Sequence, residues 1–370
     1  MSSIGAGATP VSAAGSSPDF SPDEMPMEMH RLRRRLLQIG ALLVVVVVVV
    51  MLVPGLGDVR KRLESASPGW LAVAAGLEVL SCLAYVVVFR AAFCARMTWR
   101  MSYRIGMSEL GAASVLPAGG AGGLALGAWA LRRSGLPLER VARRTVAFFL
   151  ITSAVNFAAV ILVGVALALG LLPGTGRLLL TVGPVVLAVG AILLTLAAPR
   201  LTHRLAPGWS APGRARRLRT LARALDATGD GIGEAGALLR AGNAPLLGGA
   251  IGYLAFDVAV LAGCFRAFGV PPPIAGLLLA YLVGQLGSLI PVPGGIGGAE
   301  IGLVGALVLY GTPAAVAAAA VLAYRTVLLV VPAVLGGWAF LQLKRSLRDE
   351  AAARIPCADD LPAQTVARAV

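Results

Sequence analysis

A stretch of prolines and glycines that ends in a carboxylate interrupts the apolar sequence at residues 291–300. It reads Pro-Val-Pro-Gly-Gly-Ile-Gly-Gly-Ala-Glu, so Glu300 closes it. Proline disfavours a helical conformation in the residue before it, and glycine lets the backbone turn and expose its amides. We expect a new helix to begin near Ile296, with its free N–H groups and positive dipole end facing the break. Such a break favours an anion such as phosphate, and we expect Gly294, Gly295 and Ile296 to contact it.

The glycines of this region also fit a structural interpretation. Two sets recur at every fourth position, and these are Gly294, Gly298 and Gly302, and Gly119, Gly123 and Gly127. Small residues at this spacing share one face of a helix and let membrane helices approach closely. We expect both interpretations to hold, because a closely packed break can still expose its amide groups.

Two charged residues accompany the break. Glu300 falls in the first turn of the expected helix, where the dipole favours an acid without any further function. Arg325 lies in the middle of a later apolar segment, directly after Tyr324, which belongs to the same candidate site. Ionisable side chains are costly inside a bilayer and usually face a partner or a pathway. Either Glu300 and Arg325 form a structural ion pair, or Arg325 meets a lipid phosphate while Glu300 meets a cationic headgroup or a proton.

Two further acids, Asp257 and Glu78, lie inside apolar segments and have no evident partner in the sequence. Acids in such segments often line a pathway for ions or protons. Asp257 and Glu78 are therefore candidates for coupling an ion to transport. Structural hydrogen bonding explains them at least as well.

Other kinds of chemistry find little support. Paired carboxylates, a histidine cluster and a nucleophile with a base are all missing from the sequence, so we expect no enzyme and name no catalytic residue. The glycine runs lack the Lys-Ser/Thr ending that phosphate-binding loops need. The four cysteines lack metal-ligand spacing, and we expect inert thiols at Cys82, Cys94, Cys264 and Cys357. Neither a metal nor another cofactor is predicted.

These residues belong to a chain with the composition of a membrane protein. Of its 370 residues, 58% are hydrophobic and only 14% are charged, and the mean hydropathy is +0.83. This composition favours an all-α polytopic membrane protein, in which each spanning helix needs about 20 apolar residues. The net charge of +14 then marks cytoplasmic ends and anionic headgroups, and no nucleic-acid-binding pattern accompanies it.

We predict about six transmembrane helices in this chain, at residues 36–53, 70–94, 146–170, 178–198, 246–268 and 314–343. Two further apolar stretches, 107–131 and 274–310, are interrupted by proline-glycine clusters, and we predict that they are re-entrant hairpins. With both termini in the cytoplasm, this arrangement puts most arginine clusters on the cytoplasmic side. We therefore expect a multi-pass protein of a plasma membrane of the bacterial inner-membrane type.

The predicted topology also divides the chain. We expect a disordered cytoplasmic tail at 1–30, a transmembrane domain at 31–345 with a cytoplasmic linker at 199–244, and a cytoplasmic tail at 346–370. One constant offset along the chain aligns five pairs, which are Pro117 with Pro293, Gly119 with Gly295, Gly122 with Gly298, Gly135 with Gly311 and Pro137 with Pro313. The halves 70–170 and 246–343 would form an inverted repeat, because an odd number of crossings separates their starts.

Inverted repeats whose broken helices meet near the midplane are typical of transporters. If the two breaks are equivalent, the first one contributes to the same site as the second. The first break therefore adds Pro117, Gly119 and Gly120 to the predicted lipid- or anion-binding residues.

The motif that ends at Glu300, followed by Gly311-Thr312-Pro313, Tyr324-Arg325 and Pro332, resembles the flippase-like transmembrane domain of lysylphosphatidylglycerol synthases. That family includes stand-alone members without a synthase. The earlier Pro117-Ala-Gly-Gly-Ala-Gly-Gly and Leu131-Arg-Arg-Ser-Gly135 resemble its first hairpin, and the likeness covers residues 70–343. It implies lipid translocation, since relatives move aminoacylated phosphatidylglycerol or are suspected of moving other lipid-linked groups between leaflets.

Two departures limit what the resemblance implies. Many relatives carry charged residues just after the first break, whereas Gly122, Gly123 and Leu124 are uncharged here. The chain also ends soon after its last predicted span, without the soluble domain of the synthases. We therefore expect that the protein does not make the lipid that it would move.

The favoured hypothesis is a lipid translocase that moves a phospholipid or lipid-linked headgroup through a groove formed by the two hairpins. Its partners would be membrane lipids, either an anionic phospholipid or a polyprenyl-linked substrate, and not nucleic acid. The alternatives are an ion-coupled carrier of a small solute, an accessory membrane protein, and an enzyme that acts on a lipid-linked substrate. A homo-oligomer or a lipid-modifying enzyme partner is compatible with each of them.

Overall fold

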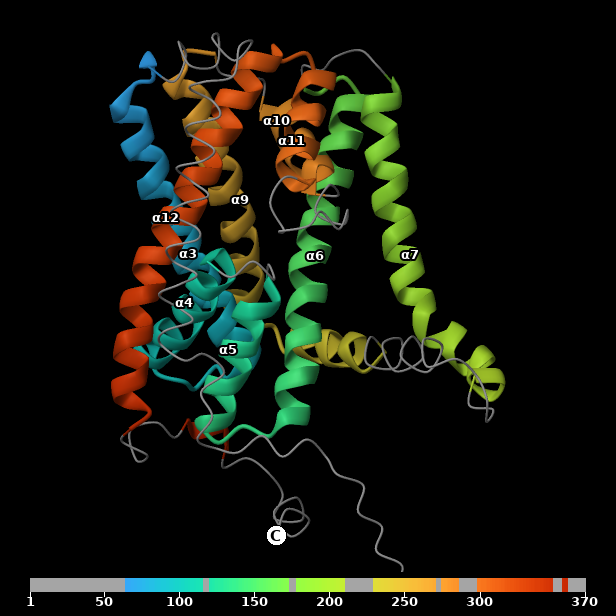
Figure 1. Ribbon diagram of the computed structural model, residues 1–370. Coiled ribbons are helices and arrows are strands. Elements are labelled where there is room, and N and C mark those ends of the chain that lie inside the picture. Colours follow the sequence, from blue (N-terminus) through green and yellow to red (C-terminus); the bar gives the residue numbers. More distant parts are fainter. Residues whose placement is uncertain are drawn as a thin grey trace, which may run out of the picture.

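The computed structural model describes seven segments of the chain, which are residues 64–115, 120–172, 178–209, 229–270, 274–285, 298–348 and 355–358. Within these ranges the regular elements are all helices, and no strand occurs (Figure 1). The predicted all-α class is therefore confirmed. The expected tail at 1–30 and the expected first span at 36–53 lie outside the described residues.

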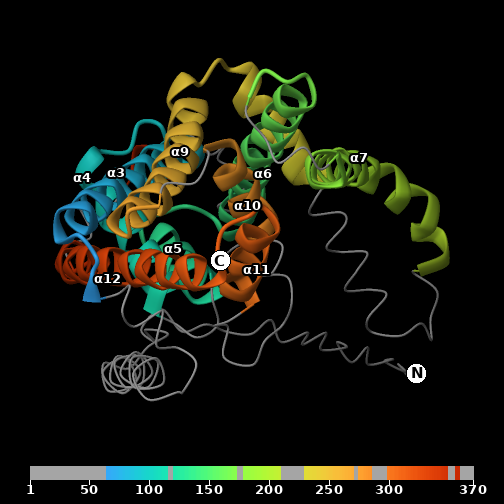
Figure 2. The ribbon, with the colours of Figure 1, turned by 90° about the horizontal axis from the view of Figure 1, so that it is seen from above.

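The long helices of the bundle are α3 (Pro68–Phe93), α6 (Leu138–Ala168), α7 (Leu178–Trp209), α9 (Ala244–Ala267) and α12 (Ala314–Ser346). Among the described residues, these five are long and apolar enough to cross a membrane. They correspond to five of the predicted spans. Figure 2 shows α7 at the outside of the bundle, where it packs against α6.

Two of the long helices differ clearly from their predictions. α7 continues to Trp209, beyond the predicted end at 198 and into the expected linker. α6 begins at Leu138, well before the predicted start at 146. Its first turns carry Glu139, Arg140, Arg143 and Arg144, which are polar but still helical. Hydropathy detects the apolar part of a helix, so a charged first turn is left out of the prediction.

Two pairs of shorter helices lie within the bundle. α4 (Trp99–Val115) packs against α5 (Gly120–Arg133), and α10 (Ile274–Gln285) packs against α11 (Gly298–Leu309). Each of these four helices is shorter than the roughly 20 residues that a bilayer crossing needs. Figure 1 shows the α4–α5 pair in the lower half of the bundle and the α10–α11 pair in the upper half. The breaks at 116–119 and 286–297 lie outside the described residues.

The predicted first hairpin began at residue 107, but α4 begins at Trp99. The missed residues include Arg100 and Arg104, and these charges resemble a solvated connection in a hydropathy profile. The second hairpin, predicted at 274–310, agrees closely with α10 and α11.

The helix boundaries follow the constant offset seen in the sequence. α3 and α6 begin at Pro68 and Leu138, and the same offset leads to Ala244 and Ala314, where α9 and α12 begin. The long helices α3 and α9 run antiparallel, because the Ser67 amide donates to the Ala267 carbonyl oxygen at 2.9 Å. At the opposite ends, Asn243 Nδ2 donates to the Ala91 carbonyl oxygen at 3.2 Å.

The turns before α6 and α12 are also equivalent. Gly135 and Gly311 have φ angles of 98° and 94°, a left-handed conformation that glycine adopts without steric cost. After each glycine the next amide reaches back to the helix that ends there, from Leu136 to the Leu131 carbonyl at 3.1 Å and from Thr312 to the Leu307 carbonyl at 3.0 Å. This is the Schellman arrangement that satisfies the last carbonyls of a helix.

Three apolar clusters fill the described part of the bundle, and the two largest each surround one short pair. The lower cluster contains Phe89, Ile105 and Leu131, and the upper cluster contains Leu277 and Leu307. Each of these two clusters joins a short helix pair to the long helices around it. Apolar burial therefore holds each pair against the bundle.

Close helix contacts depend on glycine at several places. A Cβ on Gly111 of α4 would lie 2.7 Å from Gly336 Cα of α12. Gly123 and Gly127 of α5 likewise face α4 without room for a side chain. The packing interpretation is therefore confirmed for these two members of the predicted stripes.

The structure corrects the prediction for two of the cysteines. Cys94, directly after α3, and Cys357, in the 3₁₀ turn Pro356–Ala358, form a disulfide with a Cα–Cα distance of 6.0 Å. The prediction of inert thiols is wrong for this pair, while Cys82 and Cys264 are buried and free as expected. The two bonded cysteines are 263 residues apart in the sequence, so only the tertiary structure brings them together.

Candidate functional site

The predicted site residues fall into two groups. The structure describes the side chains of Glu300, Tyr324, Arg325, Asp257 and Glu78, and it includes Gly120 as the first residue of α5. Five of the predicted residues lie outside the described part of the chain, and these are Pro117, Gly119, Gly294, Gly295 and Ile296.

Glu300 and Arg325 form the expected ion pair. Glu300 occupies the first turn of α11, where the helix dipole favours a carboxylate, and Arg325 lies inside α12. Arg325 Nε is 2.6 Å from Glu300 Oε1, and the two side chains are 45% and 21% exposed. The arginine is therefore held at one end but still accessible to a second anion.

The ion pair borders a small hollow between α10, α11 and α12. Its other walls include Tyr281, Gly284 and Tyr324, and its volume is about 40 Å³. Such a space holds a few water molecules but no lipid headgroup. A larger ligand would need this space to widen.

Asp257 is buried beside this hollow, with only 6% of its surface exposed. Its Oδ1 accepts a hydrogen bond from the Tyr324 hydroxyl at 3.0 Å, and its Oδ2 accepts one from the Tyr281 hydroxyl. The two donors come from α12 and α10, while Asp257 belongs to α9. Three helices therefore meet at one carboxyl group, as the structural interpretation of Asp257 expected.

The Glu300–Arg325 pair and the buried Asp257 are connected through two tyrosines. Tyr281 and Tyr324 hold Asp257 and also line the hollow that contains Glu300 and Arg325. Arg325 is the next residue after Tyr324 and acts electrostatically on Asp257. Any movement of α12 that opens the hollow would therefore disturb the hydrogen bonding of Asp257.

Glu78 of α3 is also buried, with 4% of its surface exposed. Its Oε1 accepts a weak hydrogen bond from the Cys82 thiol at 3.6 Å. Its Oε2 has no hydrogen-bond partner among the described residues, and Asp257 lies within electrostatic range. A buried carboxyl oxygen without a donor is costly, so Glu78 is only partly satisfied by the residues that the structure describes.

Glu109 of α4 was not among the predicted site residues. This acid is buried, and its Oε1 accepts a hydrogen bond from the Tyr85 hydroxyl at 3.0 Å. Gly127 of α5 leaves the space that the carboxyl group occupies. The first hairpin therefore contains a buried acid, although the residues after its break are uncharged. The spacing of Glu109 and Gly127 carries no sequence signal of this contact.

Tyr281 was also not among the predicted site residues. It is a polar residue in an otherwise apolar short helix, and that contrast was a usable signal. The identity of its partner, Asp257, depends on how α10 lies against α9.

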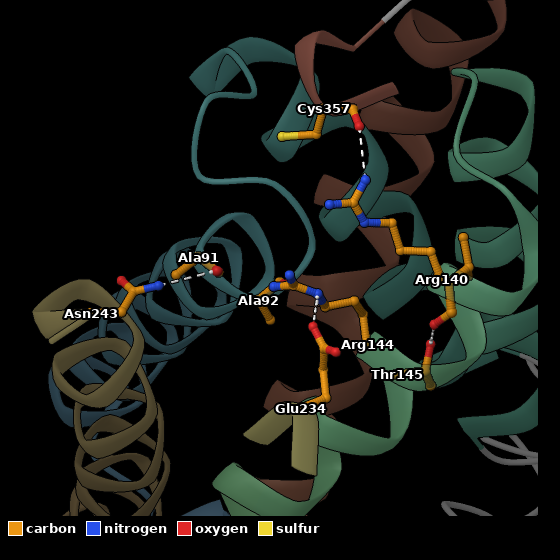
Figure 3. Close-up of polar contacts among 9 residues, drawn as sticks. Ala91, Ala92, Arg140, Arg144, Thr145, Glu234, Asn243 and Cys357 are labelled. Carbon is orange, nitrogen blue, oxygen red and sulfur yellow. Dashed lines mark hydrogen bonds and ion pairs between the residues drawn. The ribbon is translucent and has the colours of Figure 1, made fainter. Parts of the chain in front are cut away.

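The basic residues at the lower end of the bundle have structural partners (Figure 3). Arg144 Nη1 donates to the Ala92 carbonyl oxygen at 2.9 Å, and Arg144 Nε is 2.6 Å from Glu234 Oε1. Arg140 Nη1 donates to the Cys357 carbonyl oxygen at 3.0 Å. Arg144 thus satisfies a carbonyl in the last turn of α3, where the helix leaves carbonyls unpaired, and Arg140 satisfies one in the 3₁₀ turn.

Comparison with known proteins gives two matches. A family model described as the lysylphosphatidylglycerol synthase TM region matches residues 38–336. A UPF0104 membrane protein of Methanothermobacter thermautotrophicus is 39% identical over 87 residues. This match covers 23% of the present chain and 25% of the relative, so it spans about a quarter of the relative's length.

Proposed function

Because the chain belongs to the family of lysylphosphatidylglycerol synthase transmembrane regions, we propose that it is a lipid translocase. It would move a phospholipid or a lipid-linked headgroup between the two leaflets of a membrane. The family is a membrane domain with a lipid-related function, and the apolar helices make this chain a multi-pass membrane protein. We place it in a plasma membrane as part of the proposal.

The observation that carries the proposal is the Glu300–Arg325 pair inside an apolar bundle. A guanidinium can bind a phosphate through two parallel hydrogen bonds, and a carboxylate can bind an ammonium group. A phosphate could therefore bind Arg325 in place of Glu300, and an ammonium group could bind Glu300 in place of Arg325. When the headgroup carries both charges, each of the two residues keeps a counter-charge during this exchange, and the cost of an unpaired buried ion is avoided.

The proposed path uses the two short helix pairs as re-entrant hairpins from opposite sides of the membrane. The antiparallel arrangement of α3 and α9, together with the constant offset that relates the two halves, supports an inverted repeat. The ends of α5 and α12 carry Arg132, Arg133, Lys344 and Arg345, and this basic end would be cytoplasmic.

Reconstituted liposomes test the proposal directly. The purified protein should accelerate the movement of a fluorescent anionic phospholipid between leaflets, and Arg325→Ala should slow it. Arg345→Ala is the matched control, because Arg345 is exposed at the end of the same helix and does not line the hollow. Equal rates with and without protein, over several headgroups, would overturn the proposal.

Swapping the charges of Glu300 and Arg325 separates the structural role of the ion pair from its role in transport. In the variant Glu300→Arg with Arg325→Glu, an ion pair can form again, but each charge has changed helix. We expect folding to recover while transport does not, because the phosphate-binding guanidinium would then lie on α11. Full recovery of both would mean that the pair has only a structural role.

An ion-coupled carrier of a small solute is the second candidate. It is favoured by the buried acids Asp257 and Glu78, of which Glu78 has an oxygen without a donor among the described residues. Solute uptake driven by a proton or sodium gradient, without lipid movement, would select this candidate.

The same assay addresses the enzymatic alternative. We propose that the protein leaves the lipid chemically unchanged, so the lipid recovered from the vesicles should have its original mass. A new chemical species would instead assign an enzyme. A requirement for a second purified protein would identify a lipid-modifying partner.

A further inference from the structure

A second cavity lies at the C-terminal half of α3, between α3, α4 and α12. Its volume is about 520 Å³, which is within the range of small-ligand sites. Among the described residues it shares no wall with the hollow at Glu300 and Arg325. The three helices pack against one another in the lower half of Figure 1.

The walls of this cavity combine apolar, aromatic and basic side chains. Leu83 and Val87 of α3 form an apolar wall, and Arg100 and Arg104 of α4 form a basic one. The aromatic side chain of Trp99 also lines the cavity. Apolar, aromatic and basic groups are the surfaces that suit the acyl chain, interfacial region and phosphate of a phospholipid.

The basic wall carries charge that is not neutralised by the residues around it. No acidic side chain lines the cavity in the described part of the chain. Arg104 is held in place, since its Nε donates to Gln342 Oε1 at 3.4 Å and its Nη1 donates to the Ser346 hydroxyl. Both of these acceptors are neutral, so Arg104 keeps its full charge.

Arg100 is exposed and makes no hydrogen bond or ion pair with the described residues. Trp99 beside it is fixed by Arg90, whose guanidinium lies 4.4 Å from the centre of the indole ring. Among the described residues, the cavity therefore presents one guanidinium held by neutral acceptors and one that makes no such contact, next to an aromatic ring packed against Arg90. Two guanidiniums without acids nearby favour an anionic ligand.

The apolar wall continues along the membrane-facing side of α3. Five positions at alternating three- and four-residue spacing form one stripe, and these are Val73, Gly76, Leu80, Leu83 and Val87. Val73 is 48% exposed, and Leu80 and Leu83 are each 43% exposed. At 1.5 Å per residue this stripe is about 20 Å long, which is enough for an acyl chain to lie along it.

We propose that this cavity binds an anionic phospholipid, with its phosphate on Arg100 and Arg104 and one acyl chain along α3. The cavity lies at the arginine-rich end of the bundle, so the bound lipid would come from the leaflet on that side. Its role as an entry site rests on the proposed translocation, but the binding itself does not.

Photo-crosslinking tests the binding without any transport. Phosphatidylglycerol with a diazirine in its acyl chain is added to the full-length protein in phosphatidylcholine vesicles, and crosslinked peptides are identified by mass spectrometry. We expect crosslinks on the segment from Leu80 to Arg104, and competition by unlabelled phosphatidylglycerol. Inorganic phosphate at the same concentration should not compete, because it lacks the acyl chain.

Substitutions identify the part played by charge. Arg100→Gln should weaken crosslinking about tenfold, the effect of losing one charge-assisted contact to a phosphate, while Arg100→Lys should retain most of it. Arg133→Gln is the matched control, because Arg133 is an exposed arginine at the same end of the bundle, in the last turn of α5. Equal crosslinking in the Arg100→Gln and Arg133→Gln variants would overturn the proposal, and so would crosslinks confined to other helices.

The two proposals can fail separately. If crosslinking follows this pattern but no lipid moves between leaflets, the binding site stands and the translocase proposal fails. If lipid moves at the normal rate in Arg100→Gln and the crosslinks are unchanged, the translocase stands and this site is rejected.

Discussion

The hydrogen bonds of Asp257 predict how substitutions of Asp257 and Tyr324 change the free energy of unfolding. Tyr324 donates to Asp257 Oδ1 at 3.0 Å, and Tyr281 donates to Oδ2. All three side chains are buried, and the small hollow beside Tyr281 and Tyr324 is the space from which water could reach an unpaired group. Tyr324→Phe removes one donor, and Asp257→Leu removes the acceptor of both tyrosines.

The expected magnitudes follow from the cost of an unpaired buried polar group. Leaving one such group without a partner costs about 1–3 kcal/mol. Tyr324→Phe should therefore lower the free energy of unfolding by about 1–3 kcal/mol, since Asp257 Oδ1 loses its donor. Asp257→Leu should cost at least as much, because the Tyr324 and Tyr281 hydroxyls both lose this acceptor.

When Asp257 is already replaced by leucine, the effect of Tyr324→Phe on the free energy of unfolding should change sign. In the Asp257→Leu background, Tyr324→Phe removes a hydroxyl that already lacks a partner, so it should restore about 1–3 kcal/mol. Reversible unfolding of the purified protein in mixed micelles measures all four species. If Tyr324→Phe were destabilising by the same amount in both backgrounds, the two side chains would be uncoupled and our account of Asp257 would be refuted.

The remaining predictions concern the ion pair, the second cavity, helix packing and the disulfide. Arg325→Ala should slow lipid movement in liposomes while Arg345→Ala should not, and Arg100→Gln should reduce lipid crosslinking about tenfold. Gly111→Leu should destabilise the fold by at least about 1–3 kcal/mol, because a Cβ there would lie 2.7 Å from Gly336 Cα, and thermal denaturation measures the effect. Gly76→Ala, whose Cβ would meet nothing within 4 Å, is the control and should change stability by less than about 1 kcal/mol. In the oxidised purified protein, Cys94 and Cys357 should be recovered as one disulfide-linked peptide pair, and Cys82 should be alkylated only after unfolding. The proposed orientation puts the bonded pair on the cytoplasmic side, where thiols are kept reduced. Rapid alkylation in intact cells should therefore label both Cys94 and Cys357. Protection of both cysteines from alkylation would contradict that orientation.

Hydropathy predicted the long helices well because the bilayer imposes one requirement on all of them. A spanning helix needs about 20 apolar residues whatever lies beside it. The predicted span at 246–268 therefore agrees with α9 within two residues at each end. The same argument misses polar turns, which is why α4 and α6 begin earlier than predicted.

The constant offset between the two halves was also visible in the sequence, because turns have local requirements. Gly135 and Gly311 occupy left-handed positions at the ends of helices, and a proline follows each of them two residues later. Local geometry decides these residue types, so the sequence alone was sufficient to pair them.

The Glu300–Arg325 pair was predictable for a related reason. Among the few charges inside apolar segments, these two lie on neighbouring segments near the break. Because an unpaired charge in a bilayer is costly, such residues tend to find each other. Asp257 has no basic partner of this kind, and the structure satisfies it with two hydroxyls instead.

The sequence by itself therefore determined the class of the protein, most of its long helices and the breaks at which a site was expected. Each of these depends on a local property, which is hydropathy over about 20 residues or the backbone freedom of glycine and proline. The tertiary structure alone decided that Tyr281 and Tyr324 hold Asp257, that Glu109 meets Tyr85, and that Cys94 bonds with Cys357. Each of these contacts joins different helices or connections. Their partners depend on how whole helices pack side by side, which no short stretch of sequence specifies.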